Sequence, residues 1–236
     1  MSQFVIHSIP GSPFGRAVLM TLEEKGAPYT FVPVAPATLR TPQHLALHPF
    51  GRVPVLEHGG FRLCETQAIL RYLERVLPRP ALTPDDPQAA ARMDQVMNVN
   101  DWYVFHGVGN VIGFQRIVAP RVMGAKPDEA AIAAAMPKAR FVFDGLATQL
   151  GRHNYFAGET VTLADIMLAP QLDFIAQTPE WEPLTAVHGN LREWLQRLQG
   201  RPSFAATTWE KVAALGNAAG AAGVARAARA PRVASA

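Results

Sequence analysis

The sequence predicts two domains, an α/β domain at the N-terminal end followed by an all-helical domain. The first part of the chain alternates short β-prone runs with helical patterns. A proline-rich segment, residues 78–87, then interrupts the pattern. Beyond it, apolar residues recur at helical spacing. We therefore predict domains over residues 1–79 and 86–215, with a low-complexity tail of Ala, Gly and Arg over residues 216–236.

The elements of the N-terminal domain follow from local patterns. Runs rich in β-branched and aromatic residues predict the strands, and the last two flank Gly59-Gly60, which is typical of a hairpin turn. Amphipathic spacing predicts the helices, and Gly26 ends the first of them. The predicted strands are residues 4–7, 29–34, 55–57 and 61–64, and the predicted helices are residues 16–25, 43–47 and 65–77.

The second domain is predicted to contain only helices. They are expected near residues 87–118, 128–150, 162–176, 189–199 and 209–215. Thr162 and Asp165 imitate a capping box at the start of the third of these helices. We assign this pair to stability, and replacing either residue with alanine is expected to cost about 1–2 kcal/mol.

Composition excludes several classes of protein. Of the 236 residues, 49% are hydrophobic and 17% are charged, so the chain can bury a core and is not disordered. No apolar run reaches the length of about 18 residues that a membrane span needs, and the first residues lack the layout of a secretory signal. Cys64 is the only cysteine, which excludes an intrachain disulfide and fits a cytoplasmic location.

Charge and ligand spacing argue against nucleic acid and metal partners. The net charge is +3, but Arg226, Arg229 and Arg232 lie in the tail, so the body of the protein is near neutrality. No cluster of His, Cys and Asp has the spacing of metal ligands, so no metal is expected. Cys64 ends an apolar strand and lacks a C-x-x-C partner, which favours a buried packing role over redox catalysis.

Three segments carry the functional prediction: Ser12–Arg16, His48–Pro54 and Glu65–Thr66. In this order, on a β-α-β-β-α pattern, they resemble the cytosolic glutathione transferases, most closely the serine-type groups of plants and bacteria. The resemblance implies a thioredoxin-like N-terminal domain that binds glutathione as a substrate. It also implies an all-helical domain that binds the second substrate, and a homodimer.

A glutathione site must stabilise a thiolate. The thiol of free cysteine has a pKa of about 8.5, whereas the thiolate is the nucleophile. A hydroxyl next to a helix N-terminus stabilises such an anion. The resemblance implies that Ser12 donates a hydrogen bond to the thiolate, with Arg16 as a second candidate. The alternative is that Ser12 is an ordinary N-cap followed by Pro13 at the first helical position.

The resemblance also assigns the residues that hold the tripeptide. Val53 would bind its cysteinyl unit through backbone hydrogen bonds, followed by a cis Pro54. Glu65 would pair with the γ-glutamyl ammonium, and Thr66, where the family usually has serine, would bind the γ-glutamyl carboxylate. The alternatives are that Pro54 merely opens a strand and that Thr66 merely caps a helix.

The glycyl carboxylate is assigned to arginine. Arg40 and Arg52 are the candidates, because a guanidinium grips a carboxylate in two places. A histidine that related enzymes carry just before Arg40 falls on Leu39 in this chain. The alternative is that both arginines are solvated surface residues.

The second substrate is expected to contact Phe14, Trp102 and His106. An adaptable aromatic wall suits a pocket for an apolar electrophile, although residues on such a helix also serve as core or dimer interface. His106 is in addition a candidate general base, and Asp101 a candidate for contact with a neighbouring subunit's glutathione.

The predicted function is transfer of glutathione to a small apolar electrophile. The same thiolate could instead reduce hydroperoxides, dehalogenate, open an ether or isomerise a double bond. Two non-catalytic roles are alternatives. One is a carrier that binds glutathione or a similar ligand without turnover, and the other is a protein-interaction domain, against which the retained Ser12, Val53-Pro54 and Glu65-Thr66 argue.

Overall fold

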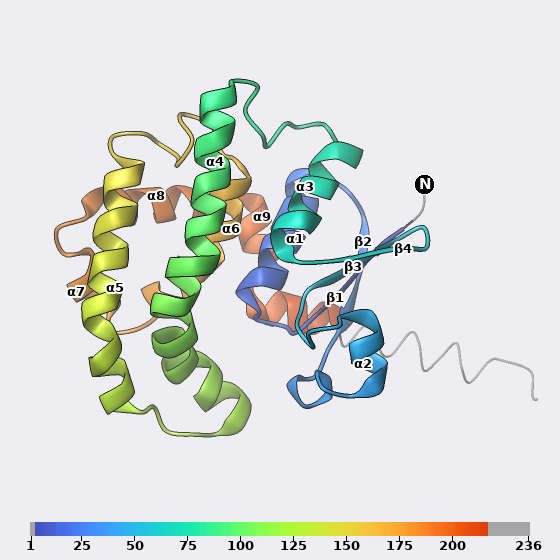
Figure 1. Ribbon diagram of the computed structural model, residues 1–236, viewed down its shortest axis with the longest axis horizontal. Helices are drawn as coiled ribbons and strands as arrows, with labels where there is room; N and C mark the ends of the chain where they lie inside the picture. Colours follow the sequence, from blue (N-terminus) through green and yellow to red (C-terminus); the bar gives the residue numbers. More distant parts are fainter. Residues whose placement is uncertain (1–2, 217–236) are drawn as a thin grey trace, which may run out of the picture.

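Figure 1 shows the computed structural model of the protein, which describes residues 3–216. A sheet with its helices forms the N-terminal part, and a set of helices packs against it. The predicted combination of a thioredoxin-like α/β domain and an all-helical domain is thus confirmed. An irregular segment over residues 77–86 separates the two parts, and the predicted bounds of the two domains stay a prediction. The predicted tail lies outside the described residues, apart from Gly216.

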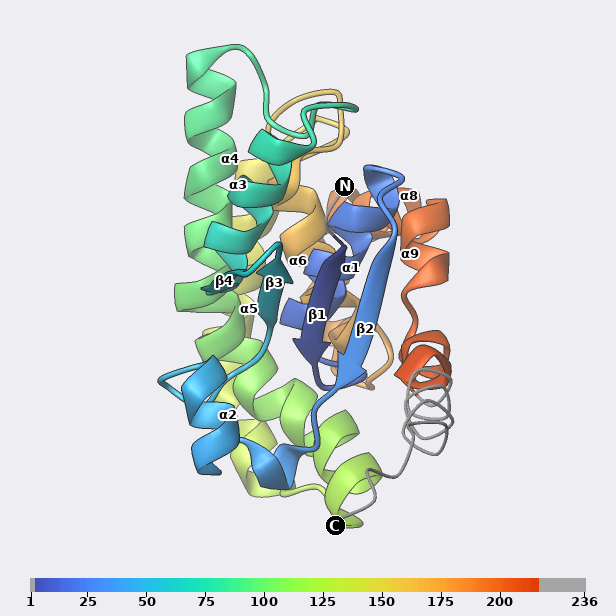
Figure 2. The ribbon, with the colours of Figure 1, turned by 90° about the vertical axis from the view of Figure 1, so that its right-hand side faces the viewer.

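The sheet has four strands in the order β2-β1-β3-β4 (Figure 2). β1 is parallel to β2 and antiparallel to β3, and β3 is antiparallel to β4. The predicted hairpin turn joins β3 and β4, and Gly59 and Gly60 both have positive φ there, at 57° and 84°. The strands are β1 (Phe4–Ser8), β2 (Tyr29–Pro33), β3 (Val55–His58) and β4 (Phe61–Cys64).

The first helix of the N-terminal domain, α1, connects the parallel strands β1 and β2. α1 begins at Pro13, earlier than predicted, because Ser12 caps it and a proline is favourable at its first position. α1 packs against both α3 and α6, and so lies between the sheet and the helical domain (Figure 2). The elements are α1 (Pro13–Glu24), the short 3₁₀ helix η1 (Pro36–Thr38), α2 (Pro42–Leu47) and α3 (Thr66–Val76).

The second domain begins with one long helical stretch. α4 (Pro87–Val99) continues directly into η2 (Asn100–Met123), a helix of the wider π type, and Gly124 ends it in the left-handed conformation. The predicted helix over residues 87–118 is thus longer and changes type within its length. The other helices are α5 (Glu129–Leu150), α6 (Leu163–Ala176), α7 (Trp181–Thr185), α8 (Gly189–Gln199) and α9 (Pro202–Ala206), with further helix over residues 209–216.

α6 is the centre of the helical domain. Every residue from Leu163 to Ile175 is buried, as expected of a helix that is surrounded by others. The predicted capping arrangement at its start is confirmed, since Asp165 Oδ2 accepts from both the N–H and the hydroxyl of Thr162 at 2.8 Å. Among residues 3–216, no helix is both long enough and apolar enough to cross a membrane.

Candidate functional site

A cleft of about 570 Å³ lies between the N-terminal domain and η2. It is formed by the start of α1, the loop before β3, the start of α3 and the first turns of η2. Arg16 and Arg40 lie outside its lining. The other residues predicted for the site line it: Ser12, Phe14, Arg52, Val53, Pro54, Glu65, Thr66, Asp101, Trp102 and His106. A larger hollow of about 830 Å³ lies between Tyr29 and the last described helix, and its described lining contains no predicted site residue.

Ser12 lines this cleft and is the N-cap of α1. Its Oγ accepts a hydrogen bond from the N–H of Gly15 at 3.2 Å. The N-cap alternative is therefore correct, but it does not exclude the functional one. A hydroxyl that accepts one hydrogen bond keeps its own hydrogen to donate. An anion placed beside Ser12 would also lie at the positive end of the α1 dipole.

Arg16 does not serve as the second thiolate partner. Its buried guanidinium donates to Asp173 Oδ2 at 2.7 Å and to the C=O of Phe204 at 3.2 Å. It also stacks on the Phe204 ring, with 3.9 Å to the centroid. Asp173 lies on α6, so Arg16 joins the two domains.

We expect Arg16→Met to lower the free energy of unfolding by about 3 kcal/mol, because it leaves the Asp173 carboxylate buried without its cation. Arg62→Met is the matched control, because its ion pair with Glu57 is partly exposed to solvent and is expected to contribute less than about 1 kcal/mol. Denaturant unfolding measures the free energy of unfolding of both variants. Equal losses of stability would contradict the role of Arg16 in joining the two domains.

The loop before β3 presents free backbone groups to the cleft. The Val53–Pro54 peptide bond is cis, as predicted. Within residues 3–216, the N–H and C=O of Val53 have no hydrogen-bond partner. His44 holds the loop by donating to the C=O of Arg52 at 2.8 Å. The backbone of Val53 is therefore fixed in place and available to a ligand.

The two candidate arginines differ in position. Arg52 is exposed and lines the cleft. Arg40 lies outside the cleft lining and donates to the C=O of Phe50 at 3.2 Å, so it supports the loop that carries Arg52. Of the two, Arg52 is thus the better placed for a ligand carboxylate.

The start of α3 combines an unpaired acid with an uncapped helix end. Glu65 has a φ of 69°, an unusual value for a residue other than glycine, and such strain often accompanies a functional position. Its exposed carboxylate has no hydrogen bond or ion pair with any described residue. No described side chain caps α3, which leaves the N–H groups near Thr66 open to an anion.

Asp101 adds a second acid near Glu65. Its Oδ2 accepts from Gln67 Nε2 at 2.7 Å. Burial raises the pKa of Asp101 above its ordinary value, and the negative charge of Glu65 raises it further. The expectation that Asp101 reaches a neighbouring subunit's glutathione stays a prediction.

Aromatic rings form the η2 wall of the cleft. Phe14 meets Phe105 edge to face, with 5.1 Å between ring centroids, and Phe105 meets His106 in the same way at 5.2 Å. Trp102 lies 6.3 Å from His106 and is 71% exposed. Phe105 was not predicted from the sequence, although its spacing from Asp101 and Trp102 places it on the same helical face.

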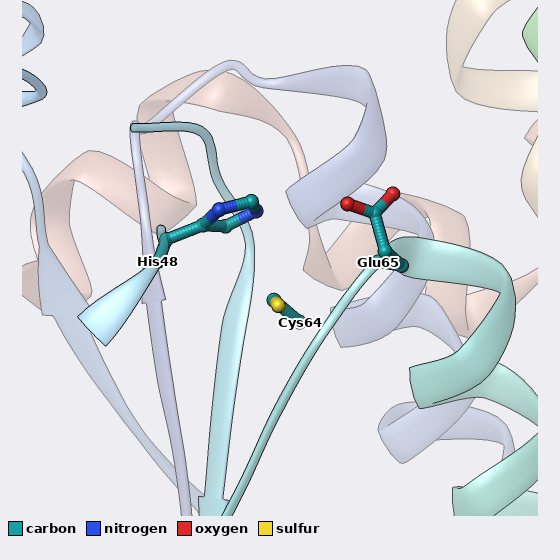
Figure 3. A group of neighbouring side chains, drawn as sticks. All are labelled: His48, Cys64 and Glu65. Carbon is teal, nitrogen blue, oxygen red and sulfur yellow. The ribbon is translucent and has the colours of Figure 1, made fainter. Parts of the chain in front are cut away.

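Figure 3 shows a side-chain group that was not predicted from the sequence either, and two of its members, His48 and Glu65, line the cleft. The ligand atoms of His48, Cys64 and Glu65 lie within 4.8 Å of one another. The three residues come from the end of α2, the end of β4 and the start of α3. Cys64 is half-buried, so the expectation that it is buried is wrong, while its predicted packing role stays a prediction. The prediction that the protein needs no metal stays a prediction.

Sequence comparisons match both halves of the chain to known families. The family described as "Glutathione S-transferase, N-terminal domain" matches residues 6–81, and "Glutathione S-transferase, C-terminal domain" matches residues 112–202. A probable glutathione S-transferase GSTF2 of Oryza sativa subsp. japonica is 31% identical over 196 residues, which are 82% of this chain and 88% of the relative. Glutathione S-transferase F14 of Arabidopsis thaliana is 32% identical over 198 residues, which are 81% and 77% of the two chains.

A solved structure shows the same fold. Glutathione S-transferase-I bound with lactoylglutathione superposes with a TM-score of 0.76 at 27% identity. The superposition covers 90% of this chain and 99% of the other.

Proposed function

The chain belongs to the glutathione S-transferase family, and on that premise we propose that it activates the thiol of glutathione at Ser12. The resulting thiolate attacks a small apolar electrophile. The observation that carries this proposal is the convergence of Ser12, Val53 and Glu65, from three separate segments, on one cleft.

The charges of the cleft match those of the tripeptide. The γ-glutamyl ammonium would pair with Glu65, near Asp101. The γ-glutamyl carboxylate would bind Thr66 and the uncapped start of α3. The cysteinyl unit would bond to the backbone of Val53 like an added strand, and the glycyl carboxylate would bind Arg52. Arg40 would support that end through Phe50.

The chemistry requires few groups. Ser12 donates a hydrogen bond to the sulfur, which lowers the thiol pKa, and the thiol proton leaves to solvent. The thiolate forms a new bond to the electrophilic carbon, and the electron pair of the broken bond departs with the leaving group. The positioning of the two substrates in one cleft supplies much of the remaining rate enhancement.

The second substrate would bind along the aromatic wall. Phe14, Phe105 and Trp102 offer apolar surface, and His106 adds a polar edge. A small apolar electrophile fits such a wall better than a charged one, because a charged molecule would lose hydration without a partner. Conjugation of such compounds would serve detoxification.

We also propose that the protein is a homodimer. Phe50 and Phe61 of the N-terminal domain and Trp102 and Tyr103 of η2 are exposed large apolar side chains. Exposed apolar surface of this kind marks interaction sites. Sedimentation velocity should give the mass of two chains, and a monomer at all concentrations would contradict the proposal.

Three assays with the same protein test the function: ligand binding, conjugation and reduction of cumene hydroperoxide. Calorimetry with S-methylglutathione measures binding to the site, and conjugation of a chlorinated nitroaromatic compound measures transfer. Turnover in the second assay is the expected result. Reduction of cumene hydroperoxide without conjugation would indicate a peroxidase, and tight binding without any turnover would indicate a carrier.

Binding should depend on pH through Asp101. The carboxylate attracts the γ-glutamyl ammonium only when it is ionised, and its pKa is raised. As the pH is lowered, the affinity for S-methylglutathione should therefore begin to fall at a higher pH than it would if Asp101 had the pKa of an ordinary aspartate. Asp101→Asn should bind more weakly at neutral pH and show a flatter profile. Calorimetric titrations at a series of pH values test this, and identical profiles for both proteins would contradict it.

A further inference from the structure

His48 is a nearly buried side chain, only 2% exposed, between two segments that contact glutathione in the proposed function. It follows α2 and precedes the loop that carries Arg52 and Val53. Figure 3 shows its imidazole and the carboxylate of Glu65 pointing toward one another, with the thiol of Cys64 beside them. Their ligand atoms lie within 4.8 Å of one another.

The backbone fixes the tautomer of this ring. The N–H of Phe50 lies 3.3 Å from His48 Nδ1, and because a backbone N–H can only donate, Nδ1 accepts. Burial lowers the pKa of His48, an effect that His44 and Arg52 reinforce and Glu65 opposes. The ring is therefore neutral at neutral pH and carries its proton on Nε2. Nε2–H is the group left to face Glu65.

The tautomer of His48 also argues against a metal ion bound by His48, Cys64 and Glu65. A nitrogen, a sulfur and a carboxylate oxygen are a donor set that zinc uses. Binding zinc through Nε2 would move the ring proton to Nδ1, where it would oppose the N–H of Phe50. The arrangement thus suits a hydrogen-bond donor better than a metal ligand.

We propose that His48 is a positioning residue for glutathione, whose Nε2–H holds the Glu65 carboxylate where the γ-glutamyl ammonium arrives. This inference rests on the proposed function. The Glu65 carboxylate is exposed and lies within 4.8 Å of a ring nitrogen of His48, and no hydrogen bond or ion pair with another residue among residues 3–216 holds it. Without contact to the Nε2–H of His48, its long side chain would sample several rotamers. Binding would then have to order that side chain, which lowers affinity.

The test compares S-methylglutathione with its desamino analogue, in which a glutaryl group replaces γ-glutamyl. A hydrogen bond to a charged group makes the wild-type protein prefer the first ligand by about tenfold or more. In His48→Leu the preference for S-methylglutathione over the desamino analogue should fall toward the small preference expected of Glu65→Gln. The affinity for the desamino analogue should stay constant. The KM for glutathione should rise, and kcat at saturating glutathione should not change.

Three variants serve as controls. His48→Gln keeps an N–H donor and should restore most of the preference. His58→Leu removes a half-buried histidine that bonds to Tyr72 outside the cleft, so it should leave the preference unchanged. Cys64→Ser should leave it unchanged as well. In the wild-type protein, ¹⁵N NMR should show His48 protonated at Nε2, which tests the tautomer even if His48→Leu fails to fold.

Equal weakening of both ligands in His48→Leu would show a merely structural role and overturn the proposal. So would protonation at Nδ1, or inhibition by zinc that Cys64→Ser abolishes, which would assign the group to a metal. Failure of the wild-type protein to bind either ligand would overturn the proposed function itself.

Discussion

Ser12→Ala is expected to lower kcat/KM for conjugation by about 10- to 100-fold near neutral pH, because a hydrogen bond to a charged group contributes about 1.5–3 kcal/mol. The hydroxyl accepts from the N–H of Gly15 and lines the cleft, so its own hydrogen is available to donate to a thiolate there. Alanine removes that donor and leaves the α1 dipole as the main stabiliser of the thiolate.

The control must separate catalysis from capping, since Ser12→Ala also removes an N-cap. Asp86→Ala removes the N-cap of α4, which lies away from the cleft. In the wild-type protein, Asp86 Oδ2 accepts from the N–H of Ala89 at 2.8 Å. Each change should cost about 1 kcal/mol of stability, but only Ser12→Ala should slow conjugation.

Ser12→Thr should retain most of the activity. Affinity for S-methylglutathione, which has no thiol, should change little. Equal kcat/KM for Ser12→Ala and the wild type would remove Ser12 from the mechanism.

Asp165→Ala should have the largest effect on stability. The buried carboxylate accepts four hydrogen bonds: from the N–H and hydroxyl of Thr162 at 2.8 Å each, from the N–H of Phe156 at 3.0 Å and from Trp194 Nε1 at 2.9 Å. Each buried donor left unsatisfied costs about 1–3 kcal/mol. The loss should therefore exceed about 3 kcal/mol, more than capping alone implies.

Thr162→Ala and Asp128→Ala provide the scale for that measurement. Thr162→Ala removes one hydroxyl donor and should cost about 1–2 kcal/mol. Asp128 is the exposed N-cap of α5, and its replacement should cost about 1 kcal/mol. Denaturant unfolding of the three variants gives the order directly. A cost for Asp165→Ala no greater than for Asp128→Ala would mean that the buried network contributes nothing beyond the cap.

Much of the fold could be predicted because local patterns determine it. The Gly59-Gly60 pair identifies a turn that needs two positive φ values, and it appears where expected. Ser12-Pro13 marks a helix start, although the apolar stripe alone placed that start three residues late, at Arg16. The short helices α7 and α9 were missed, because five residues are too few to show a period.

The site could be predicted in part, because its segments resemble a family with known roles, but side-chain partners over long distances could not. Arg16 follows Ser12 closely in sequence yet pairs with Asp173 in the other domain. His48 and Cys64 have no ligand-like spacing and meet only because α2 and β4 end at the same side of the sheet. Periodicity gives the face of an element that is buried, not the atom that a side chain meets.

The most direct test of the account is the pKa of the glutathione thiol in the complex with the wild-type protein. The ultraviolet absorbance of the thiolate, followed as a function of pH, measures it. A site at the start of α1 beside Ser12 predicts a value well below the ordinary thiol pKa of about 8.5. A bound thiol that titrates at that ordinary value or above would contradict the claim that this cleft stabilises the thiolate.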